Sequence, residues 1–365
     1  MAGPLAGVRV VELGGIGPGP FCAMLLADLG ADVVRLDRPG VPPAGYDDPR
    51  QDLLHRGKRS VAADLKQPGG VALALALAER AHIVVEGFRP GVAERLGVGP
   101  EHCRQRNPRL VYGRMTGWGQ DGPLAGRAGH DITYLAVTGI LHAIGPAAGP
   151  PQIPLNLVGD FGGGALYLAV GLLAALRHAE ATGRGQVVDA AIVDGAAHLS
   201  MMVHGLLAAG RWRDERHANL TDGGMPFYDV YATADAKHMA VGPIEPQFLA
   251  ELLDRLGLPR ALRTGDPAQL RAALAAAFAA RTRAQWTEVF AGSDACVAPV
   301  LSWHEAPEHP QLAARGTFET RDGVRQPAAA PRFSATPTAA GRPPPRPGEH
   351  DIEVLADWGV DRPGG

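Results

Sequence analysis

The sequence predicts an α/β protein whose larger part is a doubly wound, mostly parallel sheet. Four short apolar runs have the length and composition of buried strands: 8–13, 31–37, 82–88 and 109–115. Helical patterns at 20–30 and 70–81 stand between them. A strand–helix–strand order is typical of a parallel sheet covered by helices. A hydrophobic fraction of 46% with only 5% aromatic residues fits many close helix contacts made by small residues.

The alternation continues to residue 210. Residues 156–185 predict a turn, a long apolar helix and a glycine-rich stop, and residues 186–210 predict a strand followed by a helix. The polar stretch 211–224 interrupts this pattern and is expected to be a linker. The large domain is therefore expected to include residues 1–210.

A smaller α+β domain is expected at 225–325. Residues 227–242 hold two alternating runs around TADAKH, which is typical of a β-hairpin, and helical segments and a short strand at 295–302 follow. Residues 326–365 are expected to run back across the large domain and to complete it. Their proline-rich part favours an extended chain along a surface, and a short helix is predicted at 351–359.

Charge and cysteine content exclude several classes of protein. The formal net charge of −3 gives no strong field of one sign, so neither a nucleic acid nor a membrane is an expected partner. The three cysteines (Cys22, Cys103 and Cys296) lack the spacing of a zinc site or a disulfide framework. The sequence shows no signal peptide, no uninterrupted apolar stretch expected to span a bilayer, and no peroxisomal tripeptide in VDRPGG. We expect a cytoplasmic protein.

A glycine-rich loop follows the first predicted strand. Residues 14–20, GGIGPGP, lie between a strand and a helix, and Asp37 follows at the end of the next strand, where a dinucleotide-binding acid would lie. Two details argue against NAD. Pro20 takes the third fingerprint position, which favours a small residue, and Arg38 stands beside Asp37. The loop still marks a ligand site at the carboxyl end of a strand.

Two further segments place ionisable groups at the beginning of apolar runs. His130 and Asp131 follow a glycine and precede an apolar segment, and Asp160 precedes three glycines and a long apolar helix. We expect Asp131 to cap a helix at whose start His130 lies, with free N–H groups in the first turn. A capping or surface role is the ordinary alternative for His130, and helix capping is the ordinary alternative for Asp160.

Nearly the whole chain carries motifs that, in this order, resemble the class III (CaiB/BaiF) CoA-transferase family. Within it, the chain is most similar to the α-methylacyl-CoA racemases of actinobacterial type. The motifs include RGKRSVAADLK (56–66), EGFRPGVAERLGVGP (86–100), AGHDITYLAVTGILHAIG (128–145), NLVGDFGGG (156–164), AVGPIEPQF (240–248) and APRFS (330–334).

The resemblance implies an architecture that pattern alone does not give. It implies a homodimer of two interlocked chains, each with a large Rossmann-like CoA-binding domain made from both ends of the chain. It also implies a smaller domain joined by long linkers. The substrate site would lie between the large domain of one chain and the small domain of the other.

The resemblance also implies a reaction and the residues that carry it. Racemisation of a 2-methylacyl-CoA removes the proton beside the thioester carbonyl and returns one to the opposite face, through an enolate. His130 and Asp160 match the two acid/base groups of the family, and their titrations are expected to be coupled. Asp131 adjoins His130, and Glu245 matches a glutamate that reaches the histidine from the partner's small domain.

The resemblance implies that the family's CoA-lining positions correspond to arginines, a lysine and loop residues of this chain. Arginine side chains suit this role, because their forked guanidinium groups match phosphate oxygens. These positions are Arg38, Ala63, Asp64, Leu65, Lys66, Gly87, Phe88, Arg89, Arg95, Gly129 and Tyr134. Ordinary surface charge is the alternative for the cations. Met201 and Met202 are candidates for an adaptable acyl surface, with core packing as the alternative. The substrate brings its own CoA, and neither another cofactor nor a metal is expected.

Two other functions remain open from the sequence. In a class III CoA-transferase, Asp160 would be a nucleophile that forms an acyl anhydride. That chemistry needs no facing histidine, so the GHD at 129–131 favours the racemase. A CoA-binding module without activity is the third possibility. The presence of His130, Asp160 and Glu245 together argues against it.

Overall fold

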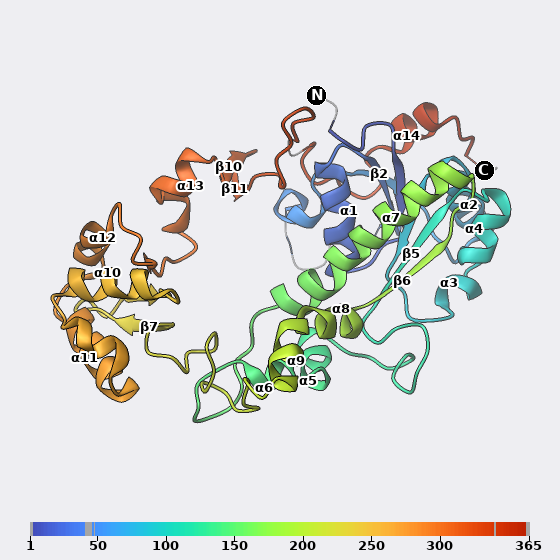
Figure 1. Ribbon diagram of the computed structural model, residues 1–365. Coiled ribbons are helices and arrows are strands. Elements are labelled where there is room, and N and C mark those ends of the chain that lie inside the picture. Colours follow the sequence, from blue (N-terminus) through green and yellow to red (C-terminus); the bar gives the residue numbers. More distant parts are fainter. Residues whose placement is uncertain (1–2, 41–45, 47, 339–340, 363–365) are drawn as a thin grey trace. The chain divides into compact units, whose positions relative to one another are not determined.

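The computed structural model describes residues 3–40, 46, 48–338 and 341–362 (Figure 1). The chain forms two compact units. The first contains residues up to Thr138, Leu155–Ser200 and the part from Ala313 onward, and the second contains Gly139–Pro154 and Met201–Leu312. Residues 139–154 and 201–210, which were predicted to belong to the large domain, lie in the second unit. Residues 313–325, which were predicted to belong to the small domain, lie in the first unit. The domain boundaries themselves stay a prediction.

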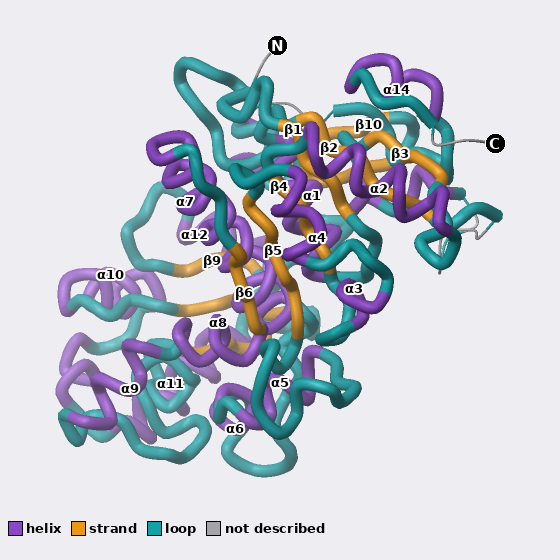
Figure 2. The backbone as a smooth tube through the Cα atoms, turned by 90° about the vertical axis from the view of Figure 1, so that its right-hand side faces the viewer, coloured by secondary structure: helices purple, strands orange, loops and turns teal. Residues whose placement is uncertain are grey.

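The first unit is built on a six-stranded sheet in the order β3-β2-β1-β4-β5-β6, with every neighbouring pair parallel. Its strands, orange in Figure 2, are β1 (Arg9–Glu12), β2 (Asp32–Asp37), β3 (Arg59–Ala62), β4 (Ile83–Glu86), β5 (Val111–Thr116) and β6 (Val187–Ala191). This confirms the predicted α/β class and parallel sheet. The sequence analysis missed β3, because this strand begins with Arg59 and Ser60 instead of an apolar run.

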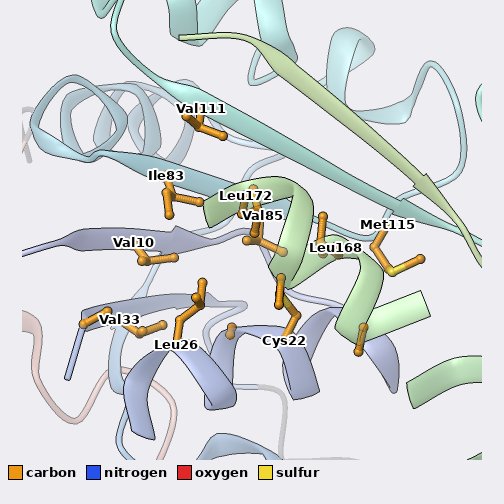
Figure 3. Packing of buried hydrophobic residues seen from close by; sticks show 14 of the residues in the cluster. Val10, Cys22, Leu26, Val33, Ile83, Val85, Val111, Met115, Leu168 and Leu172 are labelled. Atoms are coloured by element: carbon orange, nitrogen blue, oxygen red, sulfur yellow. The ribbon is translucent and has the colours of Figure 1, made fainter. Parts of the chain in front are cut away.

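One face of the sheet is covered by α1 (Pro18–Asp28) and α7 (Tyr167–Thr182). Helix α1 begins with Pro18 directly after Gly17. Proline is common at the first helical position, because its fixed φ suits a helix and its missing N–H would have no partner there. Val10, Val33 and Ile83 of the strands pack with Leu26 of α1 and Leu172 of α7 in one apolar cluster (Figure 3).

The opposite face is covered by α2 (Pro68–Arg80), α4 (Pro100–Arg106) and α14 (Asp351–Trp358). Here Val11, Val34 and Val84 point toward these helices, each one residue after a strand residue that faces α1 and α7. Strands that are buried on both faces explain the continuous apolar runs from which the sheet was predicted.

The proline-rich tail packs on the first unit, as expected. The N–H of Gly57 donates to the carbonyl of Arg342 at 2.7 Å, and the N–H of Gly348 donates to Ser60 Oγ at 2.8 Å. These bonds lead the chain along β3 to α14. A short hairpin that the sequence analysis missed precedes the tail, formed by β10 (Phe318–Arg321) and β11 (Val324–Pro327).

Near residue 157 the first unit departs from the sequence prediction. The predicted turn is a π-helix, η3 (Leu157–Leu166), which continues into α7. Together they form a 26-residue apolar helix that is long enough to cross a membrane by length and composition, so the expectation that no such stretch exists is wrong. Leu168 and Leu172 of this helix are fully buried in the cluster on the sheet. The remaining short elements are η1 (Pro49–Gln51), η2 (Leu53–His55), α3 (Val92–Arg95), α5 (Asp131–Val137) and α8 (Ile192–Leu199).

The second unit contains the predicted hairpin, β7 (Asp229–Ala232) and β8 (His238–Val241), extended by the antiparallel β9 (Val297–Pro299). Its core joins Met239 and Tyr231 of the hairpin to Leu252, Phe278 and Trp286 of the helices. Its helices are α6 (Ile140–Ala143), α9 (Met201–Ala208), α10 (Pro246–Leu256), η4 (Arg260–Thr264), α11 (Pro267–Ala279), α12 (Arg283–Phe290) and η5 (Ala306–Glu308); α13 (Pro310–Ala314) spans the boundary to the first unit.

Candidate active site

A cavity of about 320 Å³ opens at the carboxyl ends of the central strands of the first unit. Its walls are the loop after β1 with the start of α1 (Gly15–Pro20), the loop after β4 (Gly87–Pro90) and the end of β5 with the loop after it (Thr116–Trp118). Ala125, residues 127–130 and Asp160 complete the lining. Strand order reverses between β1 and β4, because β2 and β3 lie on one side and β5 and β6 on the other. Ligands of open α/β sheets bind at such a reversal point.

His130 lies at this cavity as the last residue before α5. Its side chain is exposed, and its backbone is fixed by Thr133, whose hydroxyl accepts from the His130 N–H at 3.0 Å and donates to the His130 carbonyl at 2.7 Å. The first turn of α5 is therefore closed by Thr133. The expectation that Asp131 caps this helix is wrong.

Asp131 instead points toward the neighbouring helix. Its side chain is buried, and Oδ1 accepts the N–H of Asp160 at 2.7 Å. Burial raises the pKa of Asp131, and the N–H groups of Asp160 and Gly159 oppose that rise. No local sequence pattern indicates this contact, because the two aspartates are 29 positions apart and belong to different elements.

Asp160 lies in the first turn of η3, half-buried at the cavity. Burial is the main cause that raises its pKa, and the negative charge of Asp131 adds to the rise. A weak hydrogen bond from Asn156 and the charge of His130 oppose it. The structure thus brings His130 and Asp160 to one cavity. A carboxyl that holds its proton more tightly than usual is suited to act as an acid as well as a base.

The glycine loop approaches Asp160 closely. Gly17 has a φ of 68°, and a Cβ at this position would lie 3.4 Å from Asp160 Oδ2. The acid at the end of β2, by contrast, is already engaged. The carboxylate of Asp37 accepts from Arg35 Nε at 2.9 Å and from Ser60 Oγ at 2.5 Å. These bonds occupy the group that a nucleotide ribose would need, and they argue further against NAD.

Aromatic rings form another wall of the cavity. Tyr134 of α5 is buried and packs edge-on against Trp118, with ring centroids 4.7 Å apart. A Cβ on Gly117 or Gly129 would lie 2.0 or 2.5 Å from the Tyr134 ring. Both positions therefore need glycine. The sequence analysis did not single out Trp118, although it follows directly after a predicted strand in MTGWG, the kind of position where ligand contacts gather.

The proposed CoA-contacting residues divide into two groups. Five line the cavity: Gly87, Phe88, Arg89, Gly129 and Tyr134. The others do not line it but lie mostly along the same edge of the sheet, with exposed Arg38 after β2, Ala63–Lys66 after β3, and exposed Arg95 at the end of α3. Arg127, which the sequence analysis did not name, is a further cation at the cavity.

Glu245 and the two methionines belong to the second unit. Glu245 is exposed and immediately precedes α10, the helix-start position that its place before Pro246 indicates. Met201 and Met202 on α9 are 59% and 61% exposed, so neither is a core residue of its unit.

The comparisons with known proteins agree with the motifs. The sequence pattern of CoA-transferase family III matches residues 5–351. The chain is 45% identical to the α-methylacyl-CoA racemases of mouse and human, and each alignment covers 98% of this chain and 94% of the relative. A CaiB/BaiF family protein from Brucella suis has a similar structure, with a TM-score of 0.83 at 27% identity over 98% of this chain and 100% of that one. The chain therefore belongs to CoA-transferase family III.

Proposed function

We propose that this protein is an α-methylacyl-CoA racemase, an isomerase that interconverts (2R)- and (2S)-2-methylacyl-CoA thioesters. One acid/base group takes the proton from C2, and the electron pair moves to the thioester oxygen as an enolate. The other group then donates a proton to the opposite face of C2. The two groups exchange roles in the reverse direction.

The observation that carries this proposal is the placement of His130 and Asp160 on one cavity from two independent elements, the start of α5 and the first turn of η3. A histidine and a carboxyl whose pKa is raised by burial provide two acid/base groups at one cavity. The 45% identity to two racemases supports the same choice. The N–H groups of Asp131 and Ile132 at the start of α5 are the expected donors to the enolate oxygen, because the next N–H, of Thr133, donates to the His130 carbonyl at 2.8 Å.

CoA would extend from the cavity along the carboxyl edge of the sheet. Arg38, Lys66, Arg89 and Arg95 are proposed partners of its phosphates, and the loops 63–66 and 87–89 are proposed contacts of its adenine and pantetheine parts. The reaction as written uses only acid and base groups of the protein and the CoA of the substrate. We further propose a cytoplasmic homodimer in which Glu245 of a second copy orients His130.

Proton exchange tests the proposal. The protein is incubated with one enantiomer of a 2-methylacyl-CoA in deuterated water, and deuterium at C2 and the opposite enantiomer are measured together. A racemase produces both at matching rates, and both fall in His130→Ala. Transfer of the acyl group to a free carboxylate, without exchange at C2, would instead identify Asp160 as a nucleophile and the protein as a CoA-transferase. If the protein catalyses neither proton exchange nor acyl transfer, the remaining interpretation is a CoA-binding module without activity.

A further inference from the structure

Asp131 is a nearly buried carboxylate at the candidate active site. Its exposed fraction is 8%. Oδ1 accepts the Asp160 N–H at 2.7 Å, whereas Oδ2 is buried and has no hydrogen-bond partner among the residues that the structure describes. Such a group costs folding free energy, because a buried polar atom without a partner has lost its water. Asp131 does not line the cavity itself, but it contacts Asp160, which does, and a buried unpartnered atom at such a place calls for an explanation.

The contact also excludes a side chain at its neighbour. A Cβ on Gly159 would lie 2.2 Å from Asp131 Oδ1. Gly159 therefore lets the carboxylate lie directly against the backbone of the η3 turn that carries Asp160. The carboxylate fixes the backbone of that turn, and the Asp160 side chain extends from the fixed backbone into the cavity.

We propose that Asp131 is a positioning residue that acts through Asp160, holding its backbone N–H and placing a negative charge beside its carboxyl, without itself touching the reacting carbon. This inference rests on the proposed racemase function. It gives Asp131 a different role from the helix cap expected from the sequence.

The negative charge has a predictable sign. The titratable groups that act on Asp160 are Asp131 and His130, and Tyr134 shares its surroundings. A second carboxylate makes ionisation of Asp160 less favourable, and removing it should lower the pKa of Asp160. Asp160 would then return a proton to C2 less readily at neutral pH.

Two variants separate the charge from the hydrogen bond. Asp131→Asn keeps an oxygen that can accept the Asp160 N–H but removes the charge, and Asp131→Ala removes both. In Asp131→Asn we expect the limb of the pH–kcat/KM profile that reports Asp160 to move by about half a unit to one unit toward acid, with KM nearly unchanged. In Asp131→Ala we expect kcat to fall by about 10²-fold, because the carboxyl of Asp160 is displaced.

Asp189→Asn is the matched control, since Asp189 also accepts a backbone N–H, from Gln120 at 3.3 Å, but neither residue lines the cavity. It should keep the wild-type profile. The inference is overturned if the pH–kcat/KM profile of Asp131→Asn does not move. It is also overturned if Asp131→Asn loses as much activity as His130→Ala. If Asp131→Ala does not fold, the asparagine variant alone tests the inference. Failure of the proposed function shows differently, as a wild-type protein that exchanges no proton at C2.

Discussion

The first unit holds two kinds of buried or half-buried carboxylate within a short stretch of the sheet edge. Glu12 and Glu86 end β1 and β4 with side chains that are 0% exposed, and each has a cation: Lys58 Nζ lies 2.6 Å from Glu12, and Arg114 Nε lies 3.0 Å from Glu86. Asp160 lies beyond these strand ends at the cavity, and Asp131 lies against its backbone. The carboxylate of Asp131 accepts a backbone N–H, and that of Asp160 accepts a side-chain amide of Asn156. Among the described residues, neither carboxylate forms an ion pair.

The difference separates acids that are paired with cations from the acid that we propose to react. Burial raises the pKa of Glu86 as well, but the Phe88 N–H and Arg114 both oppose that rise. For Asp160 the next largest influence after burial, the charge of Asp131, acts in the same direction as burial. Glu12 and Glu86 each hold a buried cation within the fold. An acid beside another acid can keep its proton and give it away.

The largest effect should come from the cavity pair. We expect His130→Ala and Asp160→Asn each to lower the racemisation rate by about 10²–10⁴-fold, the contribution of one positioned acid or base. Both side chains are at least partly exposed, so the fold should persist. Enantiomer formation and circular dichroism are measured for each variant. A variant that keeps near-wild-type racemisation would remove that residue from the proposed pair.

Breaking a structural pair should act on stability instead. Lys58→Met leaves the Glu12 carboxylate buried without its cation, and should destabilise the protein by about 3–5 kcal/mol. Lys58 Nζ also donates to the Pro20 carbonyl at 3.0 Å, so the start of α1 loses a contact as well. Denaturant unfolding measures the change.

The double variant Lys58→Met with Glu12→Leu is the control for this interpretation. Because it removes the whole pair, it should recover most of the lost stability. If the double variant is as unstable as the single one, the loss is due to packing or to the Pro20 contact, and not to an uncompensated charge.

The glycine loop should combine both kinds of effect. Gly17→Ala places a side chain at φ 68° and ψ −115°, a backbone conformation that L residues rarely adopt, and puts its Cβ 3.4 Å from Asp160 Oδ2. Gly40→Ala is the control, because Gly40 also has a positive φ, 70°, and no described atom would lie within 4 Å of its Cβ. Both variants should lose stability, but only Gly17→Ala should lower kcat. Equal kcat values would show that the loop does not constrain Asp160.

The sequence predicted the fold well where burial decides it. Val10–Val11 and Val33–Val34 face opposite apolar layers, so their strands appear as apolar runs. Strand β3 escaped prediction because Arg59 is held by ion pairs with Asp32, Glu353 and Asp357, two of which come from the distant C-terminal helix. No local pattern encodes contacts that a chain makes across about 300 positions.

The candidate site was predictable only through the order of its motifs. GHD and VGDF each have an ordinary capping interpretation, and nothing local shows that they share a cavity. The helical state of residues 157–166 was also missed, because the glycines at 162–164 are typical of a turn. In the structure they allow close packing instead: a Cβ on Gly163 would lie 2.6 Å from the backbone of Ala196 in α8.

The smallest effect should be a gain in stability when the carboxyl of Asp160, the proposed acid/base group, is replaced by an amide. The folded protein raises the pKa of Asp160, so the folded state holds that proton more tightly than the unfolded state does. The resulting stabilisation is complete below the ordinary aspartate pKa and is lost as the pH rises through the raised value. Asp160→Asn, which stays neutral, should therefore raise Tm at pH 7 by roughly a degree or two, with the gain vanishing in acid.

Asp48→Asn, also in the first unit, should change Tm in the opposite direction. The Arg50 guanidinium lowers the pKa of Asp48, so its contribution to stability is present above the ordinary aspartate pKa and is lost as the pH falls. This variant should lower Tm at pH 7, and the difference should shrink in acid. Thermal unfolding across a pH series compares the two directly. If Asp160→Asn gains as much at pH 3 as at pH 7, the gain comes from packing. The contrast between paired and unpaired acids would then be a matter of shape and not of charge.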